Sequence, residues 1–201
     1  MIADLKPQVA ASDILYGKHI QLEPIANRHR DEMRKAADYD HIWTYMPQKA
    51  MRNLFNRWFD DCLDKMTSGS QITYAVRRKS DQLLVGATAY YDIQIENKRL
   101  ALGYSWYTPA VWGSVVNPEA KLLMLIQAFE NWLINRIEMG TDSRNKRSYQ
   151  AIKKLGATEE GLLREHMMLH DHVITDTIVF SILACEWPVI KMRLSQRVES
   201  C

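Results

Sequence analysis

The chain has 201 residues, of which 47% are hydrophobic and 25% are charged, a composition typical of one globular domain with a sizeable core. Its formal net charge of +2 is too balanced to indicate a nucleic-acid or membrane partner, and no stretch approaches the roughly 20 apolar residues of a membrane span. The cysteine count of 3 is odd and no secretory leader is evident, which favours free thiols in a reducing compartment, so we expect a cytoplasmic protein.

The first half of the chain alternates between helical and extended patterns. Residues 1–13 are mixed in character and predict an N-terminal arm, and a strand is expected at His19–Ile25. Charge pairs predict a helix over residues 28–47, and a second helix is expected from Gln48 to Met66, where a Ser-Gly pair stops it. Three further strands, joined by polar turns as in an antiparallel meander, are expected at residues 72–78, 82–94 and 99–107.

The second half begins with a helix whose start is predicted from three consecutive residues. Asn117 suits the N-cap, Pro118 suits the first helical position, and Glu119 suits the positive end of the helix dipole. A short strand at residues 136–142 and a helix that ends at Gly156 follow. The last predicted elements form a hairpin, with strands at residues 161–170 and 172–187.

The order of these elements predicts a mixed α/β fold, with a meander before the central helix and a hairpin at the end. No internal repeat, low-complexity run or linker interrupts the chain. We therefore expect one domain over residues 14–190, followed by a C-terminal tail over residues 191–201.

Two features are compatible with either a ligand site or a purely structural role. The Gly113-Ser114 pair before the central helix leaves backbone N–H groups beside small side chains, which suits a phosphate and equally suits a plain turn. Asn145 and Ser148 share one face at the start of a later helix, where they either bind a ligand or cap the helix and bond its backbone. The basic run around them suits either a polyphosphate or a solvated helix face: Arg144, Lys146, Arg147, Lys153 and Lys154.

Other reactive side chains lack evident partners. His170 and His172 have no third ligand at a usual metal spacing, so we expect no metal site. Glu138 and Asp142 are candidate bases, but nothing pairs them with a nucleophile. Cys62 has no evident histidine partner, so we expect no thiol mechanism.

Five segments of the chain read YGKHIQLEPI, HIWTYMP, GYSWYTPAVWGSVVNPEA, TDSRNKRSYQAIKKLGATEEGLLREHM and ITDTIVFSILACEWP. In this order and at these spacings, over about residues 14–190, they resemble the GCN5-related N-acetyltransferase (GNAT) superfamily. The closest likeness is to its Rim-type branch of ribosomal-protein N-terminal acetyltransferases. The resemblance implies a central, mostly antiparallel and splayed β-sheet with helices on both faces. It also implies an acetyl-CoA-dependent N-acetyltransferase.

The resemblance assigns acetyl-CoA, as co-substrate, to a strand end and the loop that follows. Ser105, Trp106 and Tyr107 would pair with the pantetheine arm, and the helix residues Asn145, Lys146 and Ser148 would lie beside it. Asn145 would hydrogen-bond the arm, and Ser148 would lie near the sulfur. The segment that would hold the pyrophosphate comprises Gly113, Ser114, Val115, Val116, Asn117 and Pro118.

Four positions depart from the superfamily's pattern. Ala110 and Val115 replace the first residue and the second glycine of the pyrophosphate motif Q/R-x-x-G-x-G/A, so Val115 has to adopt a negative φ for the loop to keep its donors. Ala101 stands where many relatives have a glutamate base. Ile152 stands where others have a tyrosine that protonates the thiolate.

A mechanism without these groups is direct transfer in a ternary complex, with Ser148 and Asn145 as the catalytic candidates. A backbone N–H of the splayed strand would stabilise the oxyanion, and Ser148 would donate to the departing thiolate. An α-amino group, with a pKa of about 7.7–8.0, needs less help from a base than a lysine amine near about 10.4. This difference favours a protein N-terminus or a small molecule with a similarly acidic ammonium group.

The acceptor pocket is expected between the first two helices and the final hairpin, lined by Trp43, Tyr45, Arg164 and His166. Strand alternation predicts that Arg164, His166 and Met168 share one face of the hairpin. Two alternatives stay open: a degenerate relative that binds CoA as a sensor or interaction module, and a transferase for a longer acyl group. The sequence leaves both a monomer and a homodimer possible.

Overall fold

The computed structural model describes residues 13–200, whose strands form one eight-stranded sheet in the order β1-β2-β3-β4-β5-β6-β8-β7. Every neighbouring pair is antiparallel except β5 and β6, which run parallel. The predicted meander and final hairpin are confirmed, and most of the expected N-terminal arm lies outside the described residues. The strands are β1 (Leu15–Tyr16), β2 (Ile20–Pro24), β3 (Gln71–Arg78), β4 (Leu84–Gln94), β5 (Arg99–Tyr107), β6 (Arg136–Asp142), β7 (Thr158–Met168) and β8 (Ile174–Leu183).

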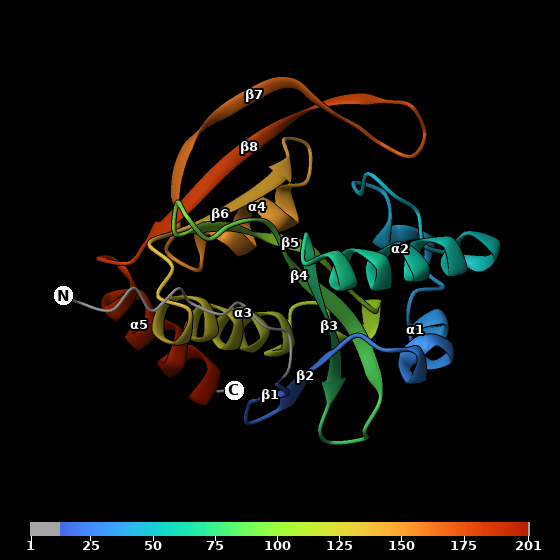
Figure 1. Ribbon diagram of the computed structural model, residues 1–201, viewed down its shortest axis with the longest axis horizontal. Coiled ribbons are helices and arrows are strands. Elements are labelled where there is room, and N and C mark those ends of the chain that lie inside the picture. Colours follow the sequence, from blue (N-terminus) through green and yellow to red (C-terminus); the bar gives the residue numbers. More distant parts are fainter. Residues whose placement is uncertain (1–12, 201) are drawn as a thin grey trace.

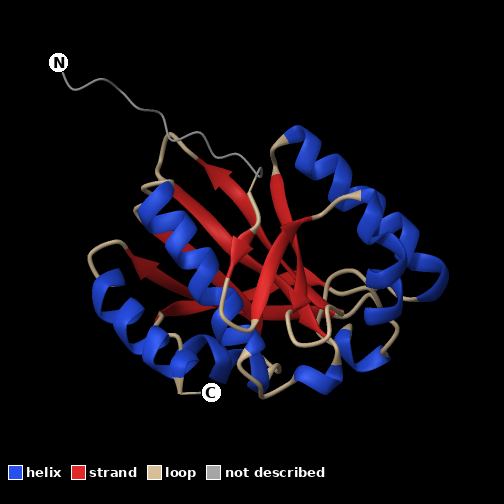
Figure 2. Cartoon of the chain, turned by 90° about the horizontal axis from the view of Figure 1, so that it is seen from below, coloured by secondary structure: helices blue, strands red, loops and turns tan. Residues whose placement is uncertain are grey.

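Helices cover both faces of the sheet, as the resemblance implied (Figures 1 and 2). One face packs against α1 (Arg30–Ala36) and α2 (Phe55–Ser68), and the other packs against α3 (Val116–Ile126) and α5 (Trp187–Glu199). The remaining α-helix, α4 (Lys146–Lys153), lies against β6. The fold is therefore a mixed α/β arrangement with an open, mostly antiparallel sheet.

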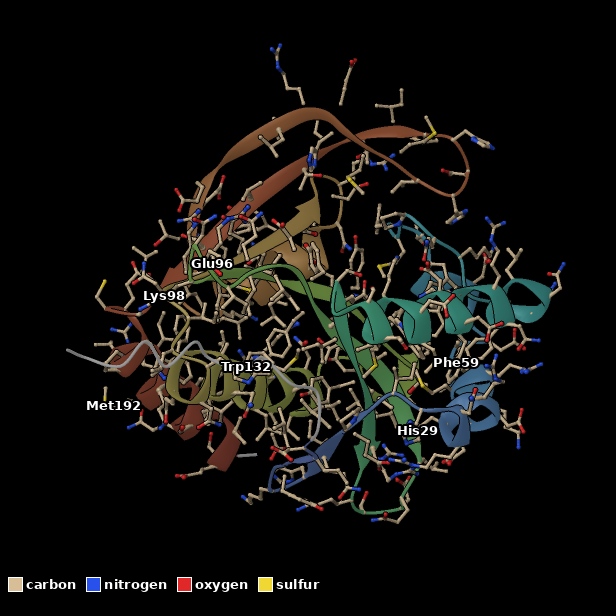
Figure 3. All side chains as sticks on the ribbon, in the orientation of Figure 1. His29, Phe59, Glu96, Lys98, Trp132 and Met192 are labelled. Carbon is tan, nitrogen blue, oxygen red and sulfur yellow. The ribbon has the colours of Figure 1, made fainter. Side chains whose placement is uncertain are left out.

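Alternation along the strands divides the core into two clusters. Tyr74, Tyr90 and Leu102 belong to the larger cluster, on the α3 face. Ala75 and Trp106 belong to the smaller one, on the α1–α2 face. Figure 3 shows the consequence, because the labelled side chains of the two clusters lie inside the molecule while those of Glu96, Lys98 and Met192 lie on its surface.

The first two helices are shorter than predicted. α1 ends at Ala36 instead of Pro47, and a 3-10 turn at Asp40–Ile42 follows it. The reason is tertiary: the buried indole of Trp43 donates from Nε1 to the carbonyl of Ala37 at 2.9 Å, which satisfies a group that a longer helix would have bonded. The predicted start of the second helix at Gln48 is also wrong, since α2 begins at Phe55 and ends as predicted before Gly69.

The central helix starts earlier than predicted. Its N-cap is Val115, so Asn117 lies inside the first turn instead of capping it. The N–H of Val116 bonds the hydroxyl of Ser114 at 3.3 Å, and this contact begins the helix two residues upstream of the expected cap. Glu119 remains in the first turn, where the helix dipole favours an anion.

The expected boundary at residue 190 falls within α5, which continues to Glu199. Ile190, Leu194 and Val198 recur at helical spacing and are all buried in the larger cluster. The segment predicted to be a tail is therefore part of the packed domain, because this apolar stripe covers the sheet beside α3. None of the described helices is long and apolar enough to cross a membrane.

Candidate active site and family

The parallel pair of β5 and β6 opens partway along its length. The two strands are paired only where Arg99–Ala101 of β5 lies beside Arg136–Glu138 of β6. Beyond these residues β5 continues to Tyr107 and β6 continues to Asp142. Past Ala101, the β5 edge that faces β6 therefore has no strand partner in the described part of the chain. Exposed backbone groups of this kind bind an extended ligand as they would bind an added strand.

A β-bulge lies in β5 at the same level. The β4–β5 register shifts between Ala87 and Ala89, so that β5 carries an extra residue there. Tyr104 has a φ of 46°, a left-handed value that is uncommon for a residue with a side chain. The bulge also changes where side chains point, because Leu102 packs in the α3-side cluster while Tyr104 lines a cavity beside α2.

The loop between β5 and α3 combines an open left-handed glycine with the N-terminus of a helix, two features compatible with a phosphate site. Gly113 has a φ of 75°, and no described atom lies within 4 Å of the place that a Cβ would occupy. Val115 has a φ of −66°, which is the negative value required of a valine at this position. Ser114 fixes the turn, since its Oγ donates to the carbonyl of Val111 at 2.7 Å and accepts the N–H of Val116. The positive end of α3 begins directly after this open turn.

The other residues expected to bind the cofactor differ in how much of their backbone and side chain is accessible. Asn117 is half-buried in the first turn of α3, whereas Pro118 is buried and has no N–H to donate. Trp106 and Tyr107 bury their side chains on opposite faces of the sheet, so only their backbone is available to a ligand. The carbonyl of Tyr107 accepts a hydrogen bond from the indole of Trp112 at 2.8 Å.

α4 begins with the cap that its sequence predicted. The Oδ1 of Asn145 accepts the backbone N–H of Ser148 at 3.1 Å, so the structural role of Asn145 is realised. Asn145 and Ser148 are half-buried at the same end of the helix. Their contact with a ligand stays a prediction.

Two arginines of the basic run contact aromatic rings on neighbouring segments. The guanidinium of Arg147 lies 3.5 Å from the ring centroid of Trp112, which connects α4 to the loop before α3. The guanidinium of Arg144 lies 5.7 Å from the ring of Tyr45 and forms an ion pair with Asp142 at 2.7 Å. The other three bases are exposed: Lys146, Lys153 and Lys154.

Trp43 was expected to line the acceptor pocket, but its side chain is buried in the core. Trp43 is only 1% exposed, and its ring centroid lies 6.1 Å from that of Trp58 and 5.5 Å from that of Trp106. Three tryptophans pack together there because large aromatic rings are the most efficient way to fill the space between α2 and the sheet. Tyr45 is half-buried nearer the surface, beside Arg144.

Arg164 and His166 line one hollow of about 780 Å³ on the hairpin, together with Glu165 and Asp176. The predicted shared face of Arg164, His166 and Met168 does not extend to Met168, because the β7–β8 register shifts between Leu163 and Met167. Glu165 has a φ of 51°, and its N–H bonds the carboxylate of Asp176 at 2.8 Å. Met168 consequently does not line this hollow.

The tip of the hairpin reaches back to the segment between α1 and α2. His170 donates from Nε2 to the carbonyl of Trp43 at 3.1 Å. Figure 1 shows the β7–β8 ribbon arching over the sheet toward the α2 side. This contact between residues 127 positions apart joins the two segments that were expected to frame the acceptor.

A second, smaller cavity of about 80 Å³ lies between α2 and the bulged strand. Its lining includes Tyr104 and the pair Asp61 and Lys65, which form a 2.7 Å ion pair one helical turn apart. Cys62 also lines it, and burial raises the pKa of this thiol to about 12, so it is not a ready nucleophile. Asp61 and Lys65 were not singled out from the sequence, because such pairs are common on exposed helix faces.

Both candidate carboxylate bases are held by arginines. Glu138 lies opposite Ala101 and accepts from Arg136 Nε at 2.9 Å. Burial alone would raise the pKa of Asp142, but hydrogen bonds from Arg144 and Thr175 outweigh it and lower that pKa. The lowered pKa makes Asp142 a weaker base than a free carboxylate. No group of three metal-ligating side chains suited to an ion occurs within residues 13–200.

Sequence reasoning missed Lys121, which lies in α3 and is 6% exposed. Its Nζ donates to Ser105 Oγ at 2.6 Å and to Thr88 Oγ1 at 3.2 Å. A polar position in the otherwise apolar stripe of α3 was the available signal, but its two partners come from β4 and β5.

Residues 19–158 match the family model described as an acetyltransferase (GNAT) domain. The chain belongs to the GNAT acetyltransferase family. This GNAT chain is similar in structure to a GCN5-related N-acetyltransferase from Brucella melitensis, at 26% identity and a TM-score of 0.85 over 92% of this chain and 85% of that one. It is also similar to a GNAT-family protein from Chromobacterium violaceum ATCC 12472, at 25% identity and a TM-score of 0.82 over 94% and 95% of the chains.

A third structure, Mycobacterium smegmatis RimJ in complex with CoA-disulfide, has the same fold at 20% identity and a TM-score of 0.75, over 89% of this chain and 88% of that one. No curated protein sequence matches the chain. Family membership makes the chain an acetyltransferase.

Proposed function

We propose that this GNAT acetyltransferase transfers an acetyl group from acetyl-CoA directly to a primary amine, with both substrates bound at once. The observation that carries the proposal is the unpaired β5 edge past Ala101, which leads into the open Gly113 loop and the start of α3. A ligand with an extended amide-bearing arm and a pyrophosphate suits both features together. The same fold in Mycobacterium smegmatis RimJ is found with a CoA disulfide.

In this proposal the chain binds and orients the substrates. The backbone of Ser105–Tyr107 pairs with the pantetheine arm, and the N–H groups around Gly113 hold the pyrophosphate. Asn145 donates to the arm from its amide nitrogen, since its Oδ1 is used by the helix cap. Ser148 donates from its hydroxyl to the departing thiolate. A backbone N–H at the β5 bulge stabilises the negative charge that develops on the carbonyl oxygen.

The acceptor is an amine that loses its proton easily. Glu138 and Asp142 are the carboxylates at the opened strands, and each is engaged by an arginine. An amine with an ammonium pKa of about 7.7–8.0 is partly neutral without help, whereas a lysine amine near about 10.4 is not. A protein or peptide N-terminus, or a small molecule of similar acidity, therefore fits best. The free thiols of Cys62 and Cys185 agree with action in the reducing cytoplasm.

A degenerate, CoA-binding relative is not favoured. Three departures from the superfamily's pattern motivate it, at Val115, Ala101 and Ile152, and Val115 replaces a glycine of the pyrophosphate motif. Because Val115 has a φ of −66°, the valine side chain forces no change in the loop backbone.

Isothermal titration with acetyl-CoA tests the cofactor half of the proposal. The informative variant is Asn145→Ser, because serine keeps a capping oxygen and loses the amide donor. We expect the wild type to bind acetyl-CoA and Asn145→Ser to bind it more weakly at an almost unchanged melting temperature. Asn145→Ala is the comparison, and it should also lose about 1 kcal/mol of stability with the cap. No binding by the wild type would contradict the proposal.

Release of free CoA thiol tests the acceptor half. Two peptides that differ at one residue and in N-terminal acetylation serve as probes, one with a free N-terminus and no lysine, the other with an acetylated N-terminus and one lysine. We expect faster release with the free N-terminus at neutral pH, and initial rates that vary with both substrates as a ternary complex requires. Binding of acetyl-CoA without turnover of any amine would instead support the sensor alternative.

A further inference from the structure

Lys121 is a lysine buried between α3 and the sheet, in the middle of the larger apolar cluster. Its side chain extends from the helix toward β4 and β5, where Nζ donates to the hydroxyls of Ser105 and Thr88. These two hydroxyls also bond each other at 2.8 Å, and Ser105 donates to the carbonyl of Gly103 at 3.2 Å. Lysine, serine and threonine thus form a closed triangle beneath the bulged strand.

A lysine in this position opposes folding. No carboxylate of residues 13–200 forms an ion pair with its Nζ, and desolvation by burial lowers its pKa from 10.5 to about 7. Burying a cation among hydroxyls and apolar groups is unfavourable, and an apolar side chain of similar length would fill the same space without that penalty. A buried ionisable group with no charged partner among the described residues is a candidate for a functional role, because such groups cluster at functional sites.

The triangle holds the part of β5 that the proposed reaction uses. Ser105 directly follows Tyr104, whose φ of 46° is unfavourable and persists only where the surroundings enforce it. Thr88 is the β4 residue that lies between the shifted pairs of the register. By hydrogen-bonding both residues, Lys121 connects the bulge to α3 on the face of the sheet opposite the Tyr104 side chain.

Charged groups on the elements around α3 are engaged elsewhere. Glu119 accepts from the backbone N–H groups of Lys18 and His19, and Glu130 pairs with Lys191. Glu23 of β2 pairs with Arg77 on the other face of the sheet. Burial raises the pKa of the nearby phenols of Tyr90 and Tyr107 above 10, so both are neutral across the working range. The remaining ionisable groups on β1 and α5 include Tyr16 and Glu199, which are exposed.

We propose that Lys121 is a positioning residue for acetyl transfer, which fixes the bulged segment of β5 through Ser105 and, as an ammonium ion, adds positive potential behind the backbone that meets the reacting carbonyl. This inference rests on the proposed function, because it concerns the same strand segment. A buried cation acts on a developing oxyanion through a medium of low dielectric constant, so its effect is larger than that of a surface charge. Lys121 itself touches neither substrate.

The test uses Lys121→Met and, as a matched control, Leu125→Met, a buried position one turn further along the same helix. Acetyl-CoA affinity, melting temperature and kcat are measured across neutral pH, with the free-N-terminus peptide as acceptor. We expect Lys121→Met to bind acetyl-CoA almost normally, to be at least as stable as the wild type, and to lose about tenfold or more in kcat, equivalent to about 1.4 kcal/mol. Leu125→Met should leave kcat close to the wild-type value.

The pH profile separates a positioning role from a packing role. If the ammonium form is the active one, wild-type kcat falls as pH rises through the pKa of Lys121, and this fall is absent in Lys121→Met. Ser105→Ala provides a second variant, because it removes the connection and keeps the lysine. We expect it to lower kcat while the alkaline fall remains.

Each other outcome overturns the inference in a recognisable way. Unchanged kcat and an unchanged pH profile in Lys121→Met would refute it, and so would a loss of kcat that only follows a loss of stability. If Lys121→Met does not fold, unchanged kcat in Ser105→Ala refutes it. Failure of the proposed function itself would be seen in the wild type, as no acetyl-CoA turnover, before any variant is compared.

Discussion

Two buried polar clusters lie on opposite faces of the sheet. In one of them the charged groups are paired with opposite charges, and in the other the charged group has only hydroxyl partners among the described residues. On the α1 face, the carboxylate of Glu23 accepts from Arg77 at 2.5 Å and bonds the ring of His29 at 2.8 Å. On the α3 face, the ammonium of Lys121 donates to the hydroxyls of Ser105 and Thr88 and has no carboxylate partner within residues 13–200. The first cluster compensates its charges and the second does not.

This difference separates a structural cluster from a candidate functional one. Burial alone would raise the pKa of Glu23, yet hydrogen bonds from Arg77, Gln21 and His29 lower it to about 2, so the folded state favours the carboxylate. Burial lowers the pKa of Lys121 to about 7, so the folded state disfavours the ammonium. A residue that stabilises the fold needs no further explanation, whereas one that opposes it does.

The largest effect is expected for Glu23→Gln, which removes the buried anion shared by Arg77 and His29 and leaves Arg77 with only one, exposed carboxylate partner, Glu32, among the described residues. Breaking a buried pair on one side should reduce the free energy of unfolding by about 3 kcal/mol, measured by urea denaturation. Glu32→Gln is the matched control, because Glu32 also pairs with Arg77 but its side chain is 47% exposed. That change should stay within about 0.5 kcal/mol. Equal losses would show that burial does not distinguish the two partners.

The two clusters should also respond to pH in separate windows. The stability that Glu23 contributes is complete above its usual pKa of 4.5 and is lost as pH falls toward about 2. The loss of stability caused by burying the Lys121 ammonium is complete below about pH 7. It decreases as pH rises toward 10.5, because the unfolded state then binds more protons than the folded state. The free energy of unfolding is measured over a pH series for the wild type and for each variant. The difference between the wild type and Glu23→Gln, or between the wild type and Lys121→Met, gives the pH range over which that residue acts. A flat difference would contradict the corresponding assignment.

A smaller effect, of opposite sign to the first, is expected for Lys121→Met at neutral pH. Removing the uncompensated cation should raise the free energy of unfolding by about 1 to 2 kcal/mol, since Ser105 and Thr88 still bond each other. Thermal and urea denaturation of the purified variant provide the measurement. A destabilised Lys121→Met would show that the lysine stabilises the core and would remove the contrast between the clusters.

The smallest effect is expected for Thr88→Val, which keeps the side-chain shape and removes one of the two acceptors of Lys121. The stability should fall by about 1 kcal/mol, the typical value of one hydrogen bond. The pKa of Lys121 should fall further, because the charged form loses a partner, and NMR titration of its ε-methylene group measures this. An unchanged pKa would show that Thr88 does not contribute to holding the ammonium.

Short-range contacts explain most of what the sequence predicted correctly. The cap at Asn145, the helix stop at Gly69 and the polar turns of the meander each depend on hydrogen bonds or backbone angles within a few residues. The predictions failed where a distant group intervened. The buried indole of Trp43 bonds the carbonyl of Ala37 and so ends the first helix early. In the hairpin, the N–H of Glu165 bonds Asp176 at a bulge that breaks the alternation.

The order of the elements, the buried faces and the glycine loop before α3 follow from the amino-acid sequence alone, because periodicity and local backbone preference are properties of neighbouring residues. The place where the β5–β6 pair opens and the position of the β5 bulge depend on the packing of the whole domain. The same packing brings Lys121 into contact with Ser105 and Thr88, 16 and 33 residues away along the chain. These contacts depend on strand register and on helix packing across the sheet, and no short stretch of sequence encodes either.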